Sequence, residues 1–254
     1  MITRILLPLG VLATVAMTAC GGSGSSYRAS APAAATRAVS PPAIAASPTP
    51  PAIVIDGPAA SATLSIPFEI SGTADVAEGA LSVSVSDASG TLCEHDLKAA
   101  SGGATPRAWR TTMAFAPPAA PGPVTVRAFS RSPQDGAAVN VVTRTVQVTG
   151  SPPDIVIAEP RCAADLAAES ALRVSGTARV FEAALTVELR AGTGAVVGQR
   201  HVTADAGAPA TGRWSAVLDL TGIPAGRYDL VAYSISARDG APEHVFSIPV
   251  RITV

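Results

Sequence analysis

The residues with the most distinctive chemistry are the cysteines, one of which lies two positions from a histidine. Cys93 and His95 belong to the run Cys-Glu-His-Asp at 93–96. Residues two apart on a β-strand point to the same face, so the pair would supply two ligands of a metal site. Two ligands are too few, and the second half of the chain has Val197 and Gln199 in their place. We therefore expect no metal site and interpret this run as a solvent-facing strand.

Cys20 follows a short apolar segment with the order of a secretory signal. Arg4 is the only charge among the first 19 residues, residues 5–16 are mostly apolar, and the small residue Ala19 precedes Cys20. This segment resembles the bacterial lipobox, with Met17 where that motif usually has leucine. The resemblance implies cleavage before Cys20 and a diacylglycerol group on its sulfur. Ordinary signal-peptide cleavage beside an incidental cysteine is the alternative.

Residues 1–51 are thus interpreted as a targeting signal followed by a tether. Residues 1–19 are interpreted as a lipoprotein signal peptide, and residues 20–51 as a lipid-anchored tether rich in Ala, Pro and Ser with almost nothing to bury. A lipid on Cys20 holds a protein by buried acyl chains rather than by a spanning helix. We expect an extracytoplasmic protein, anchored to the bacterial cell membrane through Cys20, whose tether lifts the folded part into the wall layer.

Cys93 and Cys162 remain once Cys20 is assigned to the lipid, in a compartment that permits disulfides. They occupy non-equivalent positions in the two halves of the chain, so neither belongs to a disulfide repeated within each half. The hypothesis is that they bond to each other and fix the angle between two domains. Two free thiols are the alternative. The short, proline-stiffened joint at 149–153 keeps the neighbouring ends close.

The chain after residue 51 contains two copies of one unit. Ser-Gly-Thr-Ala at 71–74 returns at 175–178, and Trp109 returns as Trp214 in the same order along the chain. Apolar and polar residues alternate in short runs such as 185–190, while Gly, Pro and Asp-Gly mark turns between them. No stretch of useful length has helical periodicity.

This pattern predicts an all-β fold of two tandem immunoglobulin-like antiparallel β-sandwiches, at residues 52–149 and 153–254. In the second copy the strands are expected near Ile155–Ile157, Ala171–Ala178, Ala184–Arg190, Val196–Thr203, Trp214–Leu220, Arg227–Ser236 and Val245–Val254. Neither copy has a cysteine pair of its own, so each core must hold by packing. Trp109 and Trp214 are interpreted as core residues rather than carbohydrate-stacking platforms, and Tyr228 stands where a tyrosine corner would.

Several of these elements carry a family resemblance. The Ser-Gly-Thr-Ala element, Phe181-Glu182-Ala183, the run at 206–209, the tryptophan strand and the run at 236–240 resemble the bacterial spore-germination immunoglobulin-like domain. The resemblance covers nearly everything from Ile53 to Val254 as two copies. It implies a sandwich fold and an envelope setting in a GC-rich bacterium. The germination-and-sporulation domain that often accompanies this family has no counterpart in this sequence, so no role in germination is inferred.

No group of residues predicts catalysis. The three histidines occupy non-equivalent places, and the Asp-Gly pairs at 135–136 and 239–240 are interpreted as turns rather than calcium loops. We expect no catalytic residues, no cofactor and no enzyme activity. A formal net charge of -1 gives no reason to expect nucleic acid as a partner.

The leading hypothesis for function is a non-enzymatic binding or scaffolding protein that contacts an envelope protein or a wall polymer. Phe129 and Tyr233 hold matched positions beside Arg127, Arg131 and Arg238, and aromatic residues with arginine are frequent in contact hot spots. Ordinary packing of the sheets is the other explanation of these residues. The alternatives for function are a passive structural spacer of the envelope and, more remotely, a wall-glycan hydrolase, for which the scattered carboxylates give no support.

Overall fold

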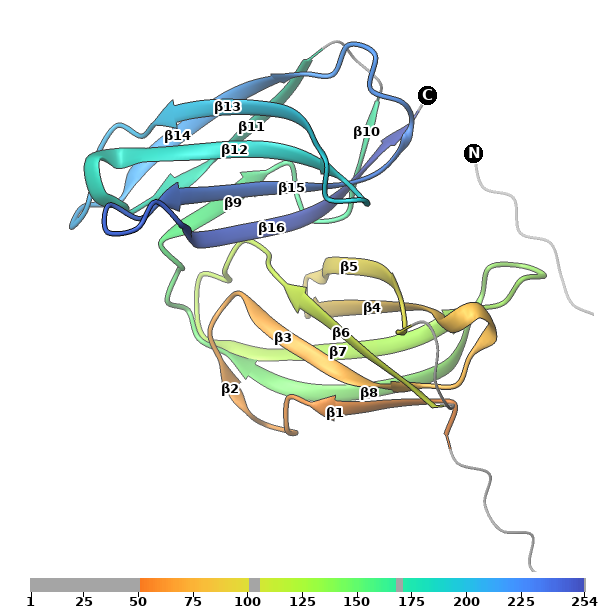
Figure 1. Cartoon of the computed structure of the whole chain (residues 1–254). Helices are drawn as coiled ribbons and strands as arrows, with labels where there is room; N and C mark the ends of the chain where they lie inside the picture. The colour runs from red at the N-terminus through yellow and green to blue at the C-terminus, as the bar shows by residue number, and fades with distance from the viewer. Residues whose placement is uncertain (1–50, 101–105, 168–170, 254) are drawn as a thin grey trace, which may run out of the picture. The chain divides into compact units, whose positions relative to one another are not determined.

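A computed structural model describes residues 51–100, 106–167 and 171–253, which form two β-sandwiches (Figure 1). The predicted signal peptide, Cys20 and the tether up to residue 50 lie outside the described residues. Helical structure in the described part consists of two short 3₁₀ turns, Ala77–Gly79 and Phe181–Ala183. No helix there is long and apolar enough to cross a membrane.

The first sandwich pairs a three-stranded sheet, in the order β1-β3-β6, with a five-stranded sheet, in the order β2-β8-β7-β4-β5. All neighbours are antiparallel except the short β2, which runs parallel to β8. The strands are β1 Ile53–Gly57, β2 Thr63–Leu64, β3 Phe68–Ala74, β4 Ala80–Asp87, β5 Gly90–Lys98, β6 Arg107–Met113, β7 Gly122–Arg131 and β8 Ala138–Val148.

The second sandwich repeats this arrangement, with sheets in the orders β14-β11-β9 and β10-β16-β15-β12-β13. Its strands are β9 Ile155–Glu159, β10 Ala164–Ala167, β11 Ala171–Ala178, β12 Ala184–Ala191, β13 Val196–Thr203, β14 Gly212–Asp219, β15 Gly226–Ile235 and β16 Pro242–Thr253. The predicted all-β fold with two tandem immunoglobulin-like sandwiches is confirmed.

The structure adds one strand to each copy that the sequence did not predict. β2 pairs Leu64 with Val148, and β10 pairs Leu166 with Ile252, both in parallel with the last strand of their own sandwich. These segments are two and four residues long, too short to show an alternating pattern. Their partners lie more than 80 residues later in the sequence, so only the tertiary fold brings them together.

The repeated Ser-Gly-Thr-Ala element has a steric explanation. Gly72 pairs with Trp109, and Gly176 pairs with Trp214, in the antiparallel ladders of the three-stranded sheets. A Cβ on Gly176 would lie 1.8 Å from the Val156 carbonyl oxygen and 2.9 Å from Cζ2 of Trp214. Both tryptophans are buried, which confirms that they fill the core. Glycine at this position therefore lets the indole and the neighbouring backbone approach the strand.

The last two strands of each sandwich share the same irregularity. The register between β7 and β8 shifts beside Phe129, and the register between β15 and β16 shifts beside Tyr233. The partner strands there contain Asn140 and His244 with φ of 54° and 55°. Each shift has the character of a β-bulge, which re-aims side chains locally. The matched aromatic residues thus lie in matched irregular segments.

Candidate functional site

Phe129 lies on the face of the five-stranded sheet that points away from the sandwich core. Its neighbour Ala128 belongs to the apolar core cluster, whereas Phe129 does not, as expected for adjacent residues of a strand. Cζ of Arg127 lies 4.7 Å from the centroid of the Phe129 ring, and Cζ of Arg131 lies 5.2 Å from it. Arg131 also forms an ion pair with Glu94 of β5. Two guanidinium groups therefore cover this ring.

Tyr233 holds the corresponding place in the second sandwich and is fixed by a carboxylate. Its Oη donates a hydrogen bond to Glu188 Oε1 at 2.7 Å, and Gln199 Nε2 donates to the same oxygen at 3.1 Å. Arg190 Nε donates to the other oxygen of Glu188 at 2.7 Å. Burial and the neighbouring Glu188 carboxylate raise the pKa of Tyr233. The buried Glu188 is thus satisfied by three donors, which hold the tyrosine in place.

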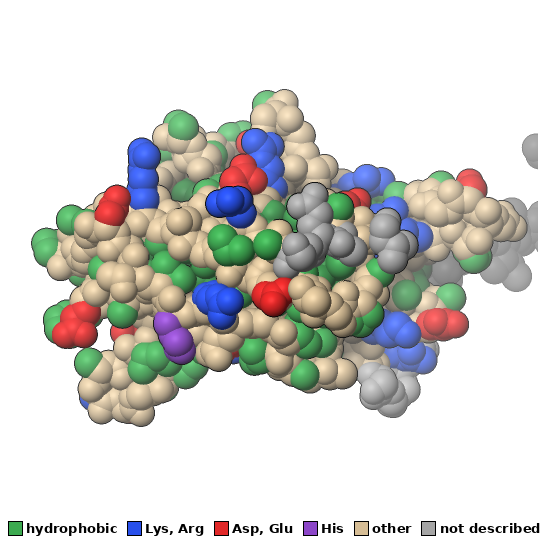
Figure 2. Space-filling model, turned by 90° about the horizontal axis from the view of Figure 1, so that it is seen from above, with side chains coloured by type: hydrophobic (Ala, Val, Ile, Leu, Met, Phe, Trp, Pro, Cys, Tyr) green, Lys and Arg blue, Asp and Glu red, His purple; other side chains and the backbone are tan. Residues whose placement is uncertain are grey.

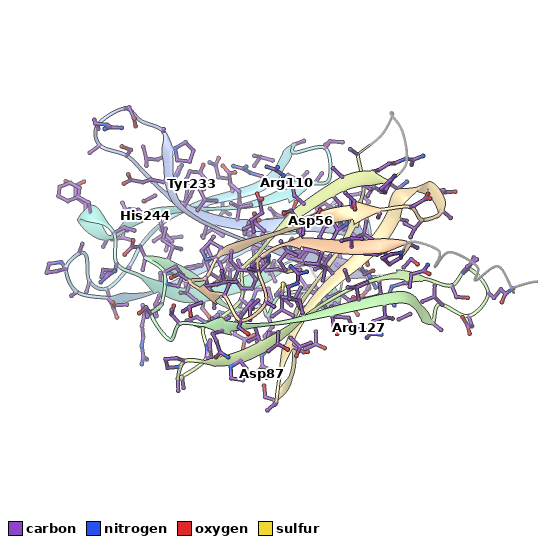
Figure 3. All side chains as sticks on the ribbon, turned by 90° about the horizontal axis from the view of Figure 1, so that it is seen from below. Asp56, Asp87, Arg110, Arg127, Tyr233 and His244 are labelled. Carbon is purple, nitrogen blue, oxygen red and sulfur yellow. A yellow bond between two sulfur atoms is a disulfide. The ribbon has the colours of Figure 1, made fainter. Side chains whose placement is uncertain are left out.

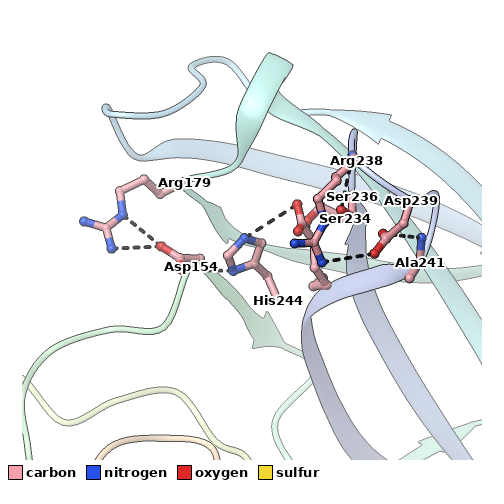
Figure 4. A network of polar contacts seen from close by, with 9 residues as sticks. Asp154, Arg179, Ser234, Ser236, Arg238, Asp239, Ala241 and His244 are labelled. Atoms are coloured by element: carbon pink, nitrogen blue, oxygen red, sulfur yellow. Dashed lines mark hydrogen bonds and ion pairs between the residues drawn. The ribbon is translucent and has the colours of Figure 1, made fainter.

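These contacts correct the expectation of an aromatic contact surface. Phe129 and Tyr233 are only 2% and 7% exposed, so a partner does not reach their rings. The arginines are the accessible part of the predicted surface: the side chains of Arg131 and Arg238 are 49% and 89% exposed. Arg127 and Arg131 gather at Phe129, whereas Arg238 lies in the β15–β16 turn and pairs with Asp239 (Figure 4).

Charged side chains of both signs are interspersed on the face shown in Figure 2. Basic side chains do not merge into a continuous stripe among the residues drawn there in colour. Recognition of a phosphate backbone requires such a concentration of positive charge. This face therefore gives no support to nucleic-acid binding.

Other polar groups of the second sandwich have structural roles. Asp154, just before β9, accepts hydrogen bonds from Arg179 Nε at 3.0 Å and Nη2 at 2.8 Å, and its Oδ2 lies 3.0 Å from His244 Nδ1 (Figure 4). The Asp239 carboxylate accepts the backbone N–H of Ala241 at 3.2 Å. These bonds fix the start of β9 and the β15–β16 turn, in agreement with the prediction that the Asp-Gly pairs are turns.

Tyr228 anchors the connection between β14 and β15. Its Oη donates a hydrogen bond to the carbonyl oxygen of Pro224 at 2.7 Å. A buried tyrosine that bonds to backbone a few residues upstream is the arrangement of a tyrosine corner. This confirms the interpretation of Tyr228 from the sequence.

A disulfide between Cys93 and Cys162 links the two sandwiches in the structure. Cys93 lies in β5 of the first sandwich, and Cys162 lies in the segment between β9 and β10 of the second; their Cα atoms are 5.0 Å apart. Figure 3 draws disulfides as yellow bonds among the side chains. The link spans 69 residues of sequence and closes a loop through the 149–153 joint.

Ion pairs lie beside this disulfide. Asp96 Oδ2 is 2.5 Å from Arg227 Nη2 and 3.8 Å from Arg251 Nη2, and both arginines belong to the second sandwich. Ser82 Oγ also donates a hydrogen bond to Asp96. The Asp96 side chain is 19% exposed, so the group is partly shielded from solvent. One carboxylate of the first sandwich thus holds two guanidinium groups of the second.

His95 lies close to the same disulfide and corrects the interpretation of its strand. One ligand atom from each of Cys93, His95 and Cys162 lies within 4.8 Å of the others. His95 Nδ1 is 2.8 Å from Thr111 Oγ1, while Nε2 is buried without a hydrogen-bond partner among the described residues. Burial lowers the pKa of His95 to about 4, so the ring is neutral at pH 7. The segment is therefore half-buried rather than solvent-facing.

The third member of this cluster could not be read from the local sequence, because Cys162 comes from the other sandwich. The strand register also corrects the comparison of the two copies. Val85 pairs with Cys93 and Val83 with His95 in the first sandwich. In the second, Gly198 and Arg200 take these places, opposite Leu189 and Val187, rather than Val197 and Gln199. The Cys-His arrangement is therefore confined to the first copy.

Solved structures with some likeness to this chain have low sequence identity to it. A tetra-tandem repeat from the extending region of a large adhesion protein is 19% identical, with a TM-score of 0.29; the match covers 77% of this chain and 50% of that one. Fibronectin(III)-like modules of Clostridium thermocellum CbhA are 15% identical, with a TM-score of 0.25 over 80% of this chain and 93% of theirs. No curated protein matches.

A family model settles the relationship. The model for the immunoglobulin-like domain of bacterial spore germination matches residues 52–137 and 154–241, once in each sandwich. Both matched segments contain the Gly-Trp pairing, and each ends just before the last strand of its sandwich, β8 or β16. The chain therefore belongs to the family of the immunoglobulin-like domain of bacterial spore germination and contains two tandem copies of that domain.

Proposed function

We propose that this chain is a non-enzymatic, lipid-anchored protein of the bacterial cell envelope that uses its tandem immunoglobulin-like domains to contact a protein or a wall polymer. The observation that carries this proposal is the joining of the two sandwiches by the Cys93–Cys162 disulfide, with Asp96 bound to Arg227 and Arg251 beside it. This link would let the surfaces of both domains contact one partner at the same time.

The physical advantage of the link is a lower cost of binding. Two freely jointed domains must lose relative motion when both engage one partner, whereas linked domains have lost much of it beforehand. A tether at residues 20–51 would still let the pair search the space above the membrane. This combination favours a module that holds a partner at a distance from the lipid.

The contact is proposed to use guanidinium groups rather than aromatic rings. Arg127 and Arg131 are held over Phe129, which restricts their motion while leaving half of the Arg131 side chain exposed. Guanidinium groups recognise carboxylate and phosphate oxygens in a bidentate manner. Acidic groups on a wall polymer or on a partner protein fit this chemistry.

A pelleting assay tests the proposal. The segment Ala52–Val254 contains both sandwiches and their cores, so it can be mixed with purified cell-wall sacculi and with protein-free lipid vesicles. We expect saturable pelleting with sacculi and none with vesicles, because this segment lacks the lipid. Arg127→Gln with Arg131→Gln should weaken pelleting, and the exposed Arg173→Gln in β11 should leave it unchanged. Equal pelleting with vesicles, or none with sacculi, counts against a wall polymer.

A passive spacer is the second candidate, favoured by the burial of Phe129 and Tyr233. A spacer needs length and stiffness but no specific surface. Crosslinking on live cells distinguishes the two functions: a contact protein yields a defined adduct that is lost with the Arg127 and Arg131 variants. A spacer yields no such adduct, and its phenotype is insensitive to these surface substitutions.

A further inference from the structure

We propose that the Cys93–Cys162 junction becomes a Zn²⁺ site when its disulfide is reduced, with Cys93 Sγ, Cys162 Sγ and His95 Nε2 as ligands. Cys₂His sets with one further position open to water are an established form of zinc coordination. Here the ligands come from both sandwiches. A bound Zn²⁺ would therefore hold the sandwiches together in place of the disulfide.

The spacing of the donor atoms fits the size of the ion. Zn–S bonds of about 2.3 Å and Zn–N bonds of about 2.0 Å at tetrahedral angles place ligand atoms roughly 3.5 to 3.8 Å apart. One ligand atom from each of Cys93, His95 and Cys162, for the histidine a ring nitrogen, already lies within 4.8 Å of the others. Once the S–S bond is broken, the two sulfur atoms need only separate to this distance.

The His95 ring is oriented as a metal ligand would be. When its Nδ1 carries the proton, it donates to Thr111 Oγ1 at 2.8 Å, and Nε2 presents a lone pair. Nε2 is buried and has no partner among the described side chains and backbone groups. Thr111 would then fix the tautomer, as hydrogen-bond partners of metal-bound histidines do.

A cavity beside the cluster gives access to the fourth position. It has a volume of about 630 Å³, and its lining includes His95, Cys162, Asp165, Arg227 and Arg251. Water or a small anion can reach a metal from this space.

The chemistry is a two-electron reduction followed by ligand exchange. A dithiol reductant attacks the disulfide, is itself oxidised to a disulfide, and leaves Cys93 and Cys162 as two thiols. Zn²⁺ then displaces one proton from each thiol to solvent, while the neutral His95 loses none. Reoxidation of the thiols by a disulfide of the same class would release the metal and restore the link.

Metal titration of the full chain tests the proposal. The chain is reduced with a phosphine, freed of reductant without air, and titrated with Zn²⁺ against a chromophoric chelator. We expect one Zn²⁺ per reduced chain and none per oxidised chain. Co²⁺ in its place should give a thiolate-to-metal charge-transfer band. His95→Ala should weaken binding by at least about 100-fold and Thr111→Val by about 10-fold, on the scale of first- and outer-sphere losses at such sites.

The second sandwich offers a control histidine. His201 is exposed, its Nδ1 lies 3.1 Å from Thr186 Oγ1 on the neighbouring strand β12, and Arg200 rather than His201 takes the place of His95. His201→Ala should leave zinc binding unchanged. A thermal melt gives a second readout in case a variant folds poorly. Zn²⁺ should raise the Tm of the reduced wild type but not that of reduced His95→Ala. Binding by reduced wild type no tighter than by a Cys93→Ser, Cys162→Ser double variant would overturn the proposal, as would undiminished binding by folded His95→Ala.

Discussion

Gly72 and Gly176 show at the residue scale why a short repeated element is tied to this fold. Each lies beneath a buried tryptophan and beside a backbone carbonyl that leaves no room for a side chain. The same steric demand occurs once in each copy, which explains why Ser-Gly-Thr-Ala returns with the tryptophan strand. A local sequence pattern here reports a contact between strands that are far apart in the chain.

Gly176→Ala is expected to destabilise the second sandwich by about 3 kcal/mol, because the new Cβ overlaps the Val156 carbonyl and the Trp214 ring. Urea denaturation of the chain gives the change in free energy of unfolding. Gly192→Ala is the control: a Cβ at Gly192 meets nothing within 4 Å, so stability should change little. Equal effects of the two substitutions would rule out the packing explanation.

The raised pKa of Tyr233 predicts that the folded chain loses stability at alkaline pH. Burial and Glu188 raise its pKa in the folded chain above the ordinary value of 10.0. The folded state therefore holds the phenolic proton more tightly than the unfolded chain does. The stabilisation from this group is complete below pH 10 and is lost as the pH rises through the folded pKa. Ultraviolet absorbance should show a tyrosine that ionises late, and Tyr233→Phe should remove that late step; an unchanged titration curve for Tyr233→Phe would contradict this assignment.

At the scale of elements, the long alternating strands were predictable and the short ones were not. The run at 185–190 shows its apolar face directly in the sequence, and it became β12. β2 and β10 contain too few residues for any pattern and exist because the final strand of each sandwich offers a free edge. The 3₁₀ turns that precede β4 and β12 were likewise not predicted.

The tyrosine corner allows a test of one element connection. Tyr228→Phe removes the hydrogen bond to the Pro224 carbonyl and should cost about 1 kcal/mol. The loss should be local, so hydrogen exchange of amides between β14 and β15 should quicken while those of β4 and β7 stay unchanged. Uniformly faster exchange in both sandwiches would show that Tyr228 supports more than this connection.

At the scale of the whole molecule, the candidate site depends on residues that sequence reasoning considered separately. Cys93 and Cys162 were paired as a hypothesis from the compartment and the short joint. His95 was expected on the same strand face as Cys93, but the sequence did not show that Cys162 would join them or that Asp96 would meet the second sandwich. Their neighbours Thr111, Arg227 and Arg251 come from distant strands. The predicted aromatic contact surface was wrong for a related reason. The sequence does not reveal that Arg127 and Arg131 lie over the Phe129 ring.

Reduction of the disulfide should lower the free energy of unfolding. A cross-link that closes a loop of this length restricts the unfolded chain and contributes up to about 4 kcal/mol. Chemical denaturation of oxidised and reduced protein, in a chelator that excludes metal, measures the difference. A Cys93→Ser, Cys162→Ser variant should match the reduced form and should not respond to reductant.

Asp96→Asn should loosen the coupling between the sandwiches in the reduced chain, because Arg227 and Arg251 lose their shared carboxylate. Calorimetry of the reduced variant should show two unfolding transitions that lie further apart than in the reduced wild type. Asp56→Asn alters an exposed carboxylate of the first sandwich and should leave the transitions in place. An unchanged profile for Asp96→Asn would mean that the ion pairs do not couple the domains.

The most direct measurement is a peptide map of the protein recovered from intact cells. Free thiols are blocked by an alkylating reagent before lysis, and digestion is carried out without reductant. We expect one peptide pair joined through Cys93 and Cys162, with neither residue alkylated. Recovery of both cysteines in alkylated form from folded, metal-free protein would contradict a covalently linked pair of domains.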